Sequence, residues 1–281
     1  MSIEDAPPWS KTQLRKLGDA LLERCAPPDG CPDYGTVMLW HNDLAGEVAT
    51  TLSSTQWEHK PRGQFLVTAR SKTVDTLIQK LARSSSKLDR VQDLAGVRID
   101  ADMKLTQQTL LAQEIAEYFG PDRATVKDLR EDPHAGYRAV HVWLVLPAGR
   151  AEVQIRTLHQ SEWANTYEGI ADLLGRVIRY NEPVTDERVQ RIVSYMHTLS
   201  AQIARDETIA DEVENVMDGL VQDFFDHSLS SSPPDPKLID QALEALSTVG
   251  HHAVNFQERL TKTSEYLLTL RRILDGEEVE E

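Results

Sequence analysis

The feature that most constrains the fold of this chain is a pair of β-rich segments that flank a Pro/Gly turn. The first segment is GYRAVH at 136–141 with the apolar run VWLVL at 142–146, and the second is EVQIRT at 152–157. The turn between them is PAGR at 147–150. Two short runs of this kind on either side of such a turn predict a β-hairpin.

The second strand of this hairpin would separate polar side chains from aliphatic ones. Successive side chains of a strand point to opposite faces, so Glu152, Gln154 and Arg156 are expected on one face. Val153 and Ile155 are expected on the other. A carboxylate, an amide and a guanidinium on one face are compatible with a solvated surface. They are equally compatible with the floor of a site that holds a metal ion and a phosphate.

The pattern along the chain predicts an α+β fold, a mixed β-sheet flanked by helices, with a helical C-terminal extension. Strand-like and helix-like segments alternate between residues 64 and 175, and the hairpin implies a mixed sheet. We therefore expect N-terminal helices at 1–60, a sheet domain at 61–182 and a helical extension at 183–281, with a Ser/Pro-rich linker at 228–236. Helices are predicted at 10–23, 37–52, the second half of 70–81, 106–119, 158–174, 186–225 and 238–274, and strands at 65–67, directly after Asp93 and at 124–129.

The distribution of charge favours a small polyanionic ligand. The formal net charge of −15 disfavours non-specific binding to nucleic acid. Basic residues nevertheless dominate residues 60–98, whereas acidic residues concentrate at 206–226 and 277–281. A basic centre in an acidic chain indicates a ligand such as a nucleotide.

The sequence gives no sign of secretion or membrane insertion. It opens without a charged and apolar leader, and no run approaches 18 apolar residues, so we expect a cytoplasmic protein with no membrane contact. Cys25 and Cys31 lack both a C-x-x-C spacing and a nearby histidine cluster, which does not favour a zinc site. Low cysteine use fits a reducing cytosol.

The segment RSKTVDTLIQKL at 70–81 is the first candidate phosphate site. Thr76 and Lys80 lie four residues apart and would share a helix face. A strand that brings Arg70 and Lys72 to that helix can converge four donors on a polyphosphate. The alternative is a cationic helix face in contact with water.

Asp93 is a candidate ligand for a hard cation. It comes just before a predicted buried strand, near Gly96, which allows a close approach of the backbone. Aspartate is common where strands begin, so this position is weak evidence by itself.

Four blocks in one order make a more specific pattern than any of them alone. They are RSKTVDTLIQKL, DLAGVRI at 93–99, GYRAVH and EVQIRT. With them, residues 64–176 resemble the synthetase domain of the RelA/SpoT alarmone synthetases, of the small synthetase type. The resemblance implies a nucleotidyltransferase-like fold. It also implies transfer of the β,γ-pyrophosphate of ATP to the 3′-hydroxyl of GDP or GTP, which makes (p)ppGpp.

The resemblance assigns the ATP side of the site residue by residue. Arg70 and Arg98 would sandwich the adenine between their guanidinium planes, a stacking that arginine supports and lysine does not. Lys72, Thr76 and Lys80 would hold the phosphates.

The resemblance also assigns the catalytic carboxylates and the acceptor side. Asp93 would bind Mg²⁺, and Glu152 would be a second magnesium ligand or the base that takes the 3′ proton. Tyr137 would stack on the acceptor's base, and the hairpin would place Glu152 near the ligand of Tyr137. His141 would contact the acceptor's phosphates or ribose, and Gln154 would line the acceptor site. Without a ligand role, His141 and Tyr137 would be packed residues of the hairpin.

The acceptor half departs from the family pattern in three places. Many members carry lysine in the loop before Gly-Tyr, where this chain has EDPH at 131–134. The small synthetases often show Asn-Phe-Trp where this chain has SEW at 161–163, and many members have histidine at Gly169. GDP or GTP is therefore not the only candidate acceptor. Toxic small members, which pyrophosphorylate a tRNA 3′ end or make adenosine alarmones, are the alternative.

Further expectations concern the activity and its partners. The DAD triplet at 100–102 suits a polymerase-β nucleotidyltransferase, but the Gly-Ser motif of that class is missing. A catalytically inactive nucleotide sensor is the non-enzymatic alternative. The His-Asp pair of the family's hydrolase domain does not occur, so a synthetase would need a separate hydrolase or an antitoxin as a partner. The C-terminal helices would either form a homo-oligomer or cover the site as an inhibitory element.

Overall fold

The computed structural model describes residues 1–70, 73–83, 86–180, 182–228, 255, 257–272 and 274–275. These residues form two compact units. Unit 1 contains the segments Met1–Met103, Gln107–Leu129 and Ala139–Arg156. Unit 2 contains Lys104–Thr106, Arg130–Arg138 and the described residues from Thr157 onward.

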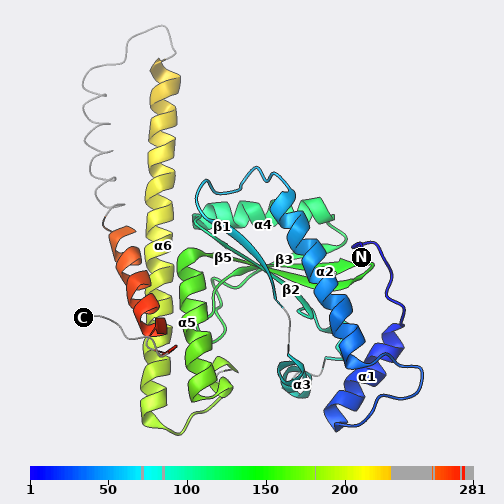
Figure 1. Cartoon of the computed structure of the whole chain (residues 1–281). Coiled ribbons are helices and arrows are strands. Elements are labelled where there is room, and N and C mark those ends of the chain that lie inside the picture. Colours follow the sequence, from blue (N-terminus) through cyan, green and yellow to red (C-terminus); the bar gives the residue numbers. More distant parts are fainter. Residues whose placement is uncertain are drawn as a thin grey trace. The chain divides into compact units, whose positions relative to one another are not determined.

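Unit 1 is built on a mixed five-stranded sheet flanked by helices, as the sequence predicts (Figure 1). Its strands are β1 (Phe65–Arg70), β2 (Ala95–Ala101), β3 (Ala124–Asp128), β4 (Val140–Leu146) and β5 (Gly149–Thr157). They lie in the order β1-β2-β5-β4-β3. The predicted hairpin is confirmed, because β4 and β5 pair antiparallel with Val142 opposite Val153.

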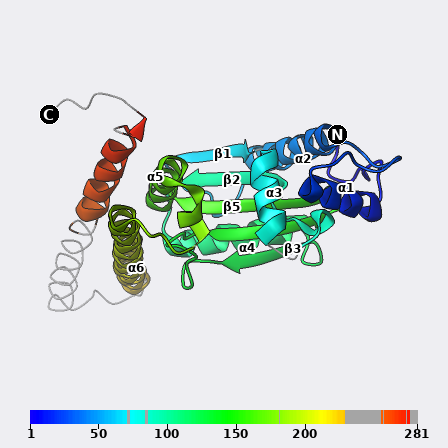
Figure 2. The ribbon, with the colours of Figure 1, turned by 90° about the horizontal axis from the view of Figure 1, so that it is seen from below.

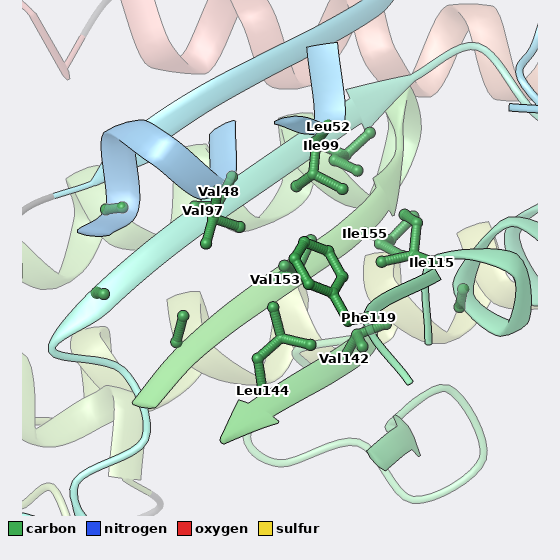
Figure 3. Packing of buried hydrophobic residues seen from close by; sticks show 14 of the residues in the cluster. Val48, Leu52, Val97, Ile99, Ile115, Phe119, Val142, Leu144, Val153 and Ile155 are labelled. Carbon is green, nitrogen blue, oxygen red and sulfur yellow. The ribbon is translucent and has the colours of Figure 1, made fainter. Parts of the chain in front are cut away.

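Two helices cover one face of this sheet and form the main core. They are α2 (Tyr34–Ser54) and α4 (Leu105–Phe119). Their apolar side chains meet those of the inward-facing strand residues (Figure 3). Val48 of α2 and Ile115 of α4, for example, share this core with Val153 of β5.

The other face of the sheet carries α3 (Val74–Arg83), which Figure 2 shows crossing the strands on the side away from α4. Its buried residues Leu77 and Leu81 join a second cluster with α1 (Lys11–Glu23) and the short helix η1 (Leu88–Arg90). Ser10 caps α1 through a capping box with Gln13, as the predicted start of that helix requires. This cluster fixes α3, and with it the polar side chains that α3 carries.

Unit 2 is helical, with α5 (Leu158–Leu174), η2 (Arg176–Tyr180) and α6 (Glu187–Ser228). Trp163 and Tyr167 of α5 pack against Met196 and Ile203 of α6, and Leu267 joins them. The predicted linker at 228–236 lies outside the described residues except for Ser228, which ends α6. Of the helix predicted at 238–274, residues 257–272 are helical, and residues 238–254 lie outside the described part. Every helix in the described part of the chain is too short or too polar to span a bilayer.

A buried carboxyl group ties α6 to the beginning of α5. Glu207 accepts hydrogen bonds from the hydroxyl of Thr157, the N-cap of α5, and from the amide of Gln160 at 3.1 Å. Burial raises the pKa of Glu207 to about 7, although these hydrogen bonds and the positive charges of Arg130 and Arg138 favour its ionised form.

We expect Glu207→Gln to remove a pH-dependent loss of stability. An unfolded glutamate gives up its proton near pH 4.5, whereas Glu207 in the folded protein keeps it until about pH 7. The unfolding free energy of the wild type should therefore fall by up to about 3 kcal/mol as the pH rises through that window. Urea unfolding at pH 5 and pH 8 measures the change, with the exposed Glu212→Gln as control. Equal pH dependence in wild type and Glu207→Gln would contradict this role.

Candidate active site

One face of the sheet in unit 1 collects polar side chains from four strands. It is the face opposite the main core, since Val97, Val142, Val153 and Ile155 point into that core. By alternation along each strand, five residues singled out from the sequence lie on the polar face. They are Arg70 of β1, Arg98 of β2, His141 of β4, and Glu152 and Gln154 of β5.

Glu152 lies within hydrogen-bonding or ion-pairing distance of three nitrogen atoms on neighbouring residues. Gln154 donates from Nε2 to Oε2 at 2.8 Å, and Trp143 donates from Nε1 to Oε1 at 3.0 Å. The Nδ1 atom of His141 lies 3.3 Å from Oε1. Because Glu152 is only 7% exposed, these contacts fix the orientation of its carboxylate.

The same contacts keep Glu152 ionised. Burial opposes the charged form, but the hydrogen bond and the charge of His141, together with the hydrogen bond from Gln154, outweigh it. The pKa of Glu152 is therefore lowered. Glu152 is a carboxylate at neutral pH, held ready to accept a proton or to bind a cation.

Asp93 lies on the same side of the sheet as Glu152. Its Oδ1 atom is 2.7 Å from Nζ of Lys80, which α3 brings over this face. The negative charge of Asp93 acts on Glu152 in the direction that raises its pKa. The two carboxylates assigned from the sequence are thus brought together, with the Lys80 ammonium beside one of them.

The geometry at Arg70 and Arg98 suits a flat ring between them. Arg98 pairs with Thr68 and Arg70 pairs with Gly96, so the two arginines are diagonal neighbours on adjacent strands. Diagonal neighbours stand roughly 7–8 Å apart at the backbone, so the two long side chains can reach one ligand. Gly96 leaves the position opposite Arg70 without a side chain, which opens the face at this point.

The remaining ATP-side residues lie on or before α3. Thr76 is half-buried, and its hydroxyl is 2.6 Å from that of Thr73. Lys80 lies one turn further along the same face of the helix. Lys72 lies outside the described residues.

Arg156 shares the polar face but has a different role from its neighbours. It is fully buried, and its Nη2 and Nε atoms contact Oδ1 of Asp100 at 2.8 and 2.9 Å. The guanidinium of Arg156 therefore forms an ion pair inside unit 1 and does not line the site. Gln154 is the last residue of β5 that does. Asp100 is the first residue of the DAD triplet, so this pairing disfavours its use as a metal ligand of the polymerase-β type.

Trp143 and Lys127 belong to the same face and were not predicted as site residues. Trp143 is 37% exposed, and Nζ of Lys127 lies 5.5 Å from the centre of its ring. Lys127 pairs across the strands with His141, so a cation borders the site at its β3 edge. The only signal in the sequence is the alternation of β4, which puts Trp143 on the face of His141.

Tyr137 lies in unit 2, in the loop that precedes β4. It is half-buried, packs against the cluster around Trp163, and donates its backbone N–H to the carbonyl of His134 at 3.0 Å. Glu152 and His141 belong to unit 1. The expected position of Tyr137's ligand beside Glu152 therefore stays a prediction.

Comparisons with known proteins agree with the sequence blocks. A family model described as the region found in RelA and SpoT proteins matches residues 69–175. Uncharacterized proteins of Mycobacterium tuberculosis and Mycobacterium bovis are each 49% identical over 215 residues, covering 74% of this chain and 78% of the relative.

A solved structure shows the shared fold. The crystal structure of the small alarmone synthetase 1 from Bacillus subtilis aligns with a TM-score of 0.50 and 20% identity, covering 68% of this chain and 98% of that one. The mixed sheet with flanking helices is thus common to both proteins.

Proposed function

The chain belongs to the RelA/SpoT family, and from that premise we propose that it is an ATP-dependent pyrophosphokinase. It would transfer the β,γ-pyrophosphate of ATP to the 3′-hydroxyl of GDP or GTP. The observation that carries the proposal is the single sheet face on which Glu152, Asp93 with Lys80, and the pair Arg70 and Arg98 converge. In this proposal the arginines serve the base, Lys80 serves the triphosphate and Glu152 accepts the proton.

The two arginines would hold the adenine, and Thr76 and Lys80 would hold the phosphates. The acceptor's 3′-oxygen would form a bond to the β-phosphorus as the bond between that phosphorus and the α,β-bridging oxygen breaks, which releases AMP. The 3′ proton would pass to the carboxylate of Glu152, which is ionised at neutral pH. Negative charge grows on the leaving AMP, so the fixed cation of Lys80 beside the phosphates would stabilise the transition state.

Asp93 and Glu152 also suit a magnesium ion. Among the described residues there is no group of three or more His, Cys, Asp or Glu side chains placed to hold a metal. Magnesium at nucleotide sites, however, is usually held by one or two carboxylates together with substrate phosphates, and these two carboxylates meet that need. When bound, Mg²⁺ would neutralise phosphate charge and lower the pKa of the attacking hydroxyl.

Isotope transfer tests the proposal directly. ATP labelled at the β-phosphate and ATP labelled at the γ-phosphate are incubated separately with the protein, Mg²⁺ and GDP or GTP. Both labels should appear on the guanosine nucleotide in equal amounts, with one AMP released per transfer. Transfer of the γ-label alone would mean phosphoryl transfer and would refute the mechanism.

Other acceptors separate the alternatives. Label on uncharged tRNA or on an adenosine nucleotide, and none on GDP or GTP, would replace the guanosine acceptor with that of the toxic small synthetases and would favour an antitoxin as the partner. ATP binding without any transfer would favour a nucleotide sensor.

A further inference from the structure

The backbone on both sides of Tyr137 is held by one residue of α6. The hydroxyl of Ser200 donates to the carbonyl of Gly136 and accepts a hydrogen bond from Nε of Arg138 at 3.3 Å. Ser200 is only 3% exposed. A single hydroxyl therefore joins the residue before Tyr137 to the residue after it.

Gly136 is also enclosed by two aromatic side chains of unit 2. A Cβ atom at this position would lie 2.9 Å from Cζ2 of Trp163 on α5 and 3.1 Å from Cδ2 of His197 on α6. The φ angle of Gly136 is +81°, a conformation that other residues rarely adopt. The loop thus passes between α5 and α6 at a point where only glycine fits.

Further contacts hold the remainder of the loop. Arg138 donates from Nη1 to the carbonyl of Arg130, which closes the loop at its first residue. Ala135 is buried, and its backbone is hydrogen-bonded to His197. The contacts to α6 thus come from Ser200 and His197, which lie about one turn apart on the same helix face.

We propose that α6 sets the conformation in which Tyr137 is presented to the acceptor, with Ser200 as the positioning residue. The acceptor role of Tyr137 rests on the proposed function. A loop ordered before binding loses less conformational entropy when the acceptor arrives, so these contacts increase affinity for the guanosine nucleotide. On this view α6 is part of the acceptor site, whatever else the C-terminal helices bind.

Ser200→Ala in the full-length chain tests the proposal, with the exposed Ser194→Ala on the same helix as the matched control. Loss of the hydroxyl removes both hydrogen bonds and should raise the KM for GDP or GTP about tenfold. The KM for ATP should stay within about twofold of the wild type, because the ATP-side residues lie in unit 1. A merely structural role would raise both KM values together or leave both unchanged, and either result would overturn the proposal.

Hydrogen exchange measures how firmly the Tyr137 loop is held without relying on enzyme activity. The amides of Tyr137 and Arg138 should exchange several-fold faster in Ser200→Ala than in Ser194→Ala. Unchanged exchange would overturn the proposed restraint itself. Faster exchange with an unchanged KM for the acceptor would overturn its link to binding. If the wild type transfers no pyrophosphate to any acceptor, the proposed function fails, and the exchange comparison still decides whether α6 restrains the loop.

Discussion

Glu152→Gln is expected to lower the rate constant of pyrophosphate transfer at least about 1,000-fold. The substitution keeps the shape of the side chain but removes both its negative charge and its capacity to accept the 3′ proton. Trp143 can still donate to an amide oxygen at the Oε1 position, and Gln154 can turn its own amide so that its oxygen accepts from the new NH2 group at the Oε2 position. The quantity to measure is kcat with ATP and acceptor both saturating.

Three further measurements show whether that loss is chemical. Affinity for a non-hydrolysable ATP analogue should stay close to that of the wild type, because the arginines and Lys80 are unchanged. Urea unfolding should show that the variant is folded under the assay conditions, since glutamine has the same size and keeps a polar group beside His141, Trp143 and Gln154. Glu117→Gln, an exposed change on α4, should leave kcat unaltered. Transfer by Glu152→Gln at a tenth or more of the wild-type rate would refute the assigned role.

Much of the site could be read from the sequence because the strand period of two is independent of tertiary context. Once β5 is recognised as a strand, Glu152 and Gln154 must share a face, and Val153 must take the other. The same rule places Arg98 opposite Val97 on β2. The resemblance of the sequence blocks to a known family then indicated which strand faces belong to one site, which alternation alone cannot show.

Alternation could not reveal which strands are neighbours. The sheet order puts β2 beside β5, and only this order brings Asp100 to Arg156. From sequence alone, Arg156 was a candidate for the same surface as Glu152, yet it is fully buried. Trp143 could not be predicted as a site residue for another reason. It lies in an apolar run, where an aromatic ring predicts packing. Nothing in the sequence indicates that its indole N–H donates to Glu152, nine residues away.

The contacts of Ser200 could not be predicted from the sequence either. Its neighbours on α6 form an apolar stripe, and a serine within such a stripe fits a helix surface as well as a buried contact. Its two hydrogen bonds reach residues more than 60 positions away in the chain. A contact of this kind depends on how α6 packs within unit 2, which helical periodicity does not specify.

The largest effect on stability is expected for Arg156→Met. The substitution leaves the carboxylate of Asp100 buried without its guanidinium, and removing one member of a buried ion pair costs about 3–5 kcal/mol. Arg156 is fully buried, and the side chain of Asp100 is 12% exposed, so little water can replace the lost partner. Urea unfolding at pH 7 measures the fall in unfolding free energy.

A double variant separates the ion pair from the volume of the side chain. In Asp100→Leu with Arg156→Met no charge is left buried, and apolar residues of similar volume can replace a buried ion pair at little cost. We therefore expect the double variant to recover most of the stability that Arg156→Met loses. Arg123→Met, which breaks the ion pair with Glu4 where both side chains are exposed, should have a much smaller effect. If the double variant is as unstable as the single one, packing around Arg156 and not its charge holds this end of the sheet. In that case the size of the Arg156 side chain, and not its charge, would keep Arg156 apart from the polar site at Glu152. Arg156→Met should then also disturb the binding of ATP.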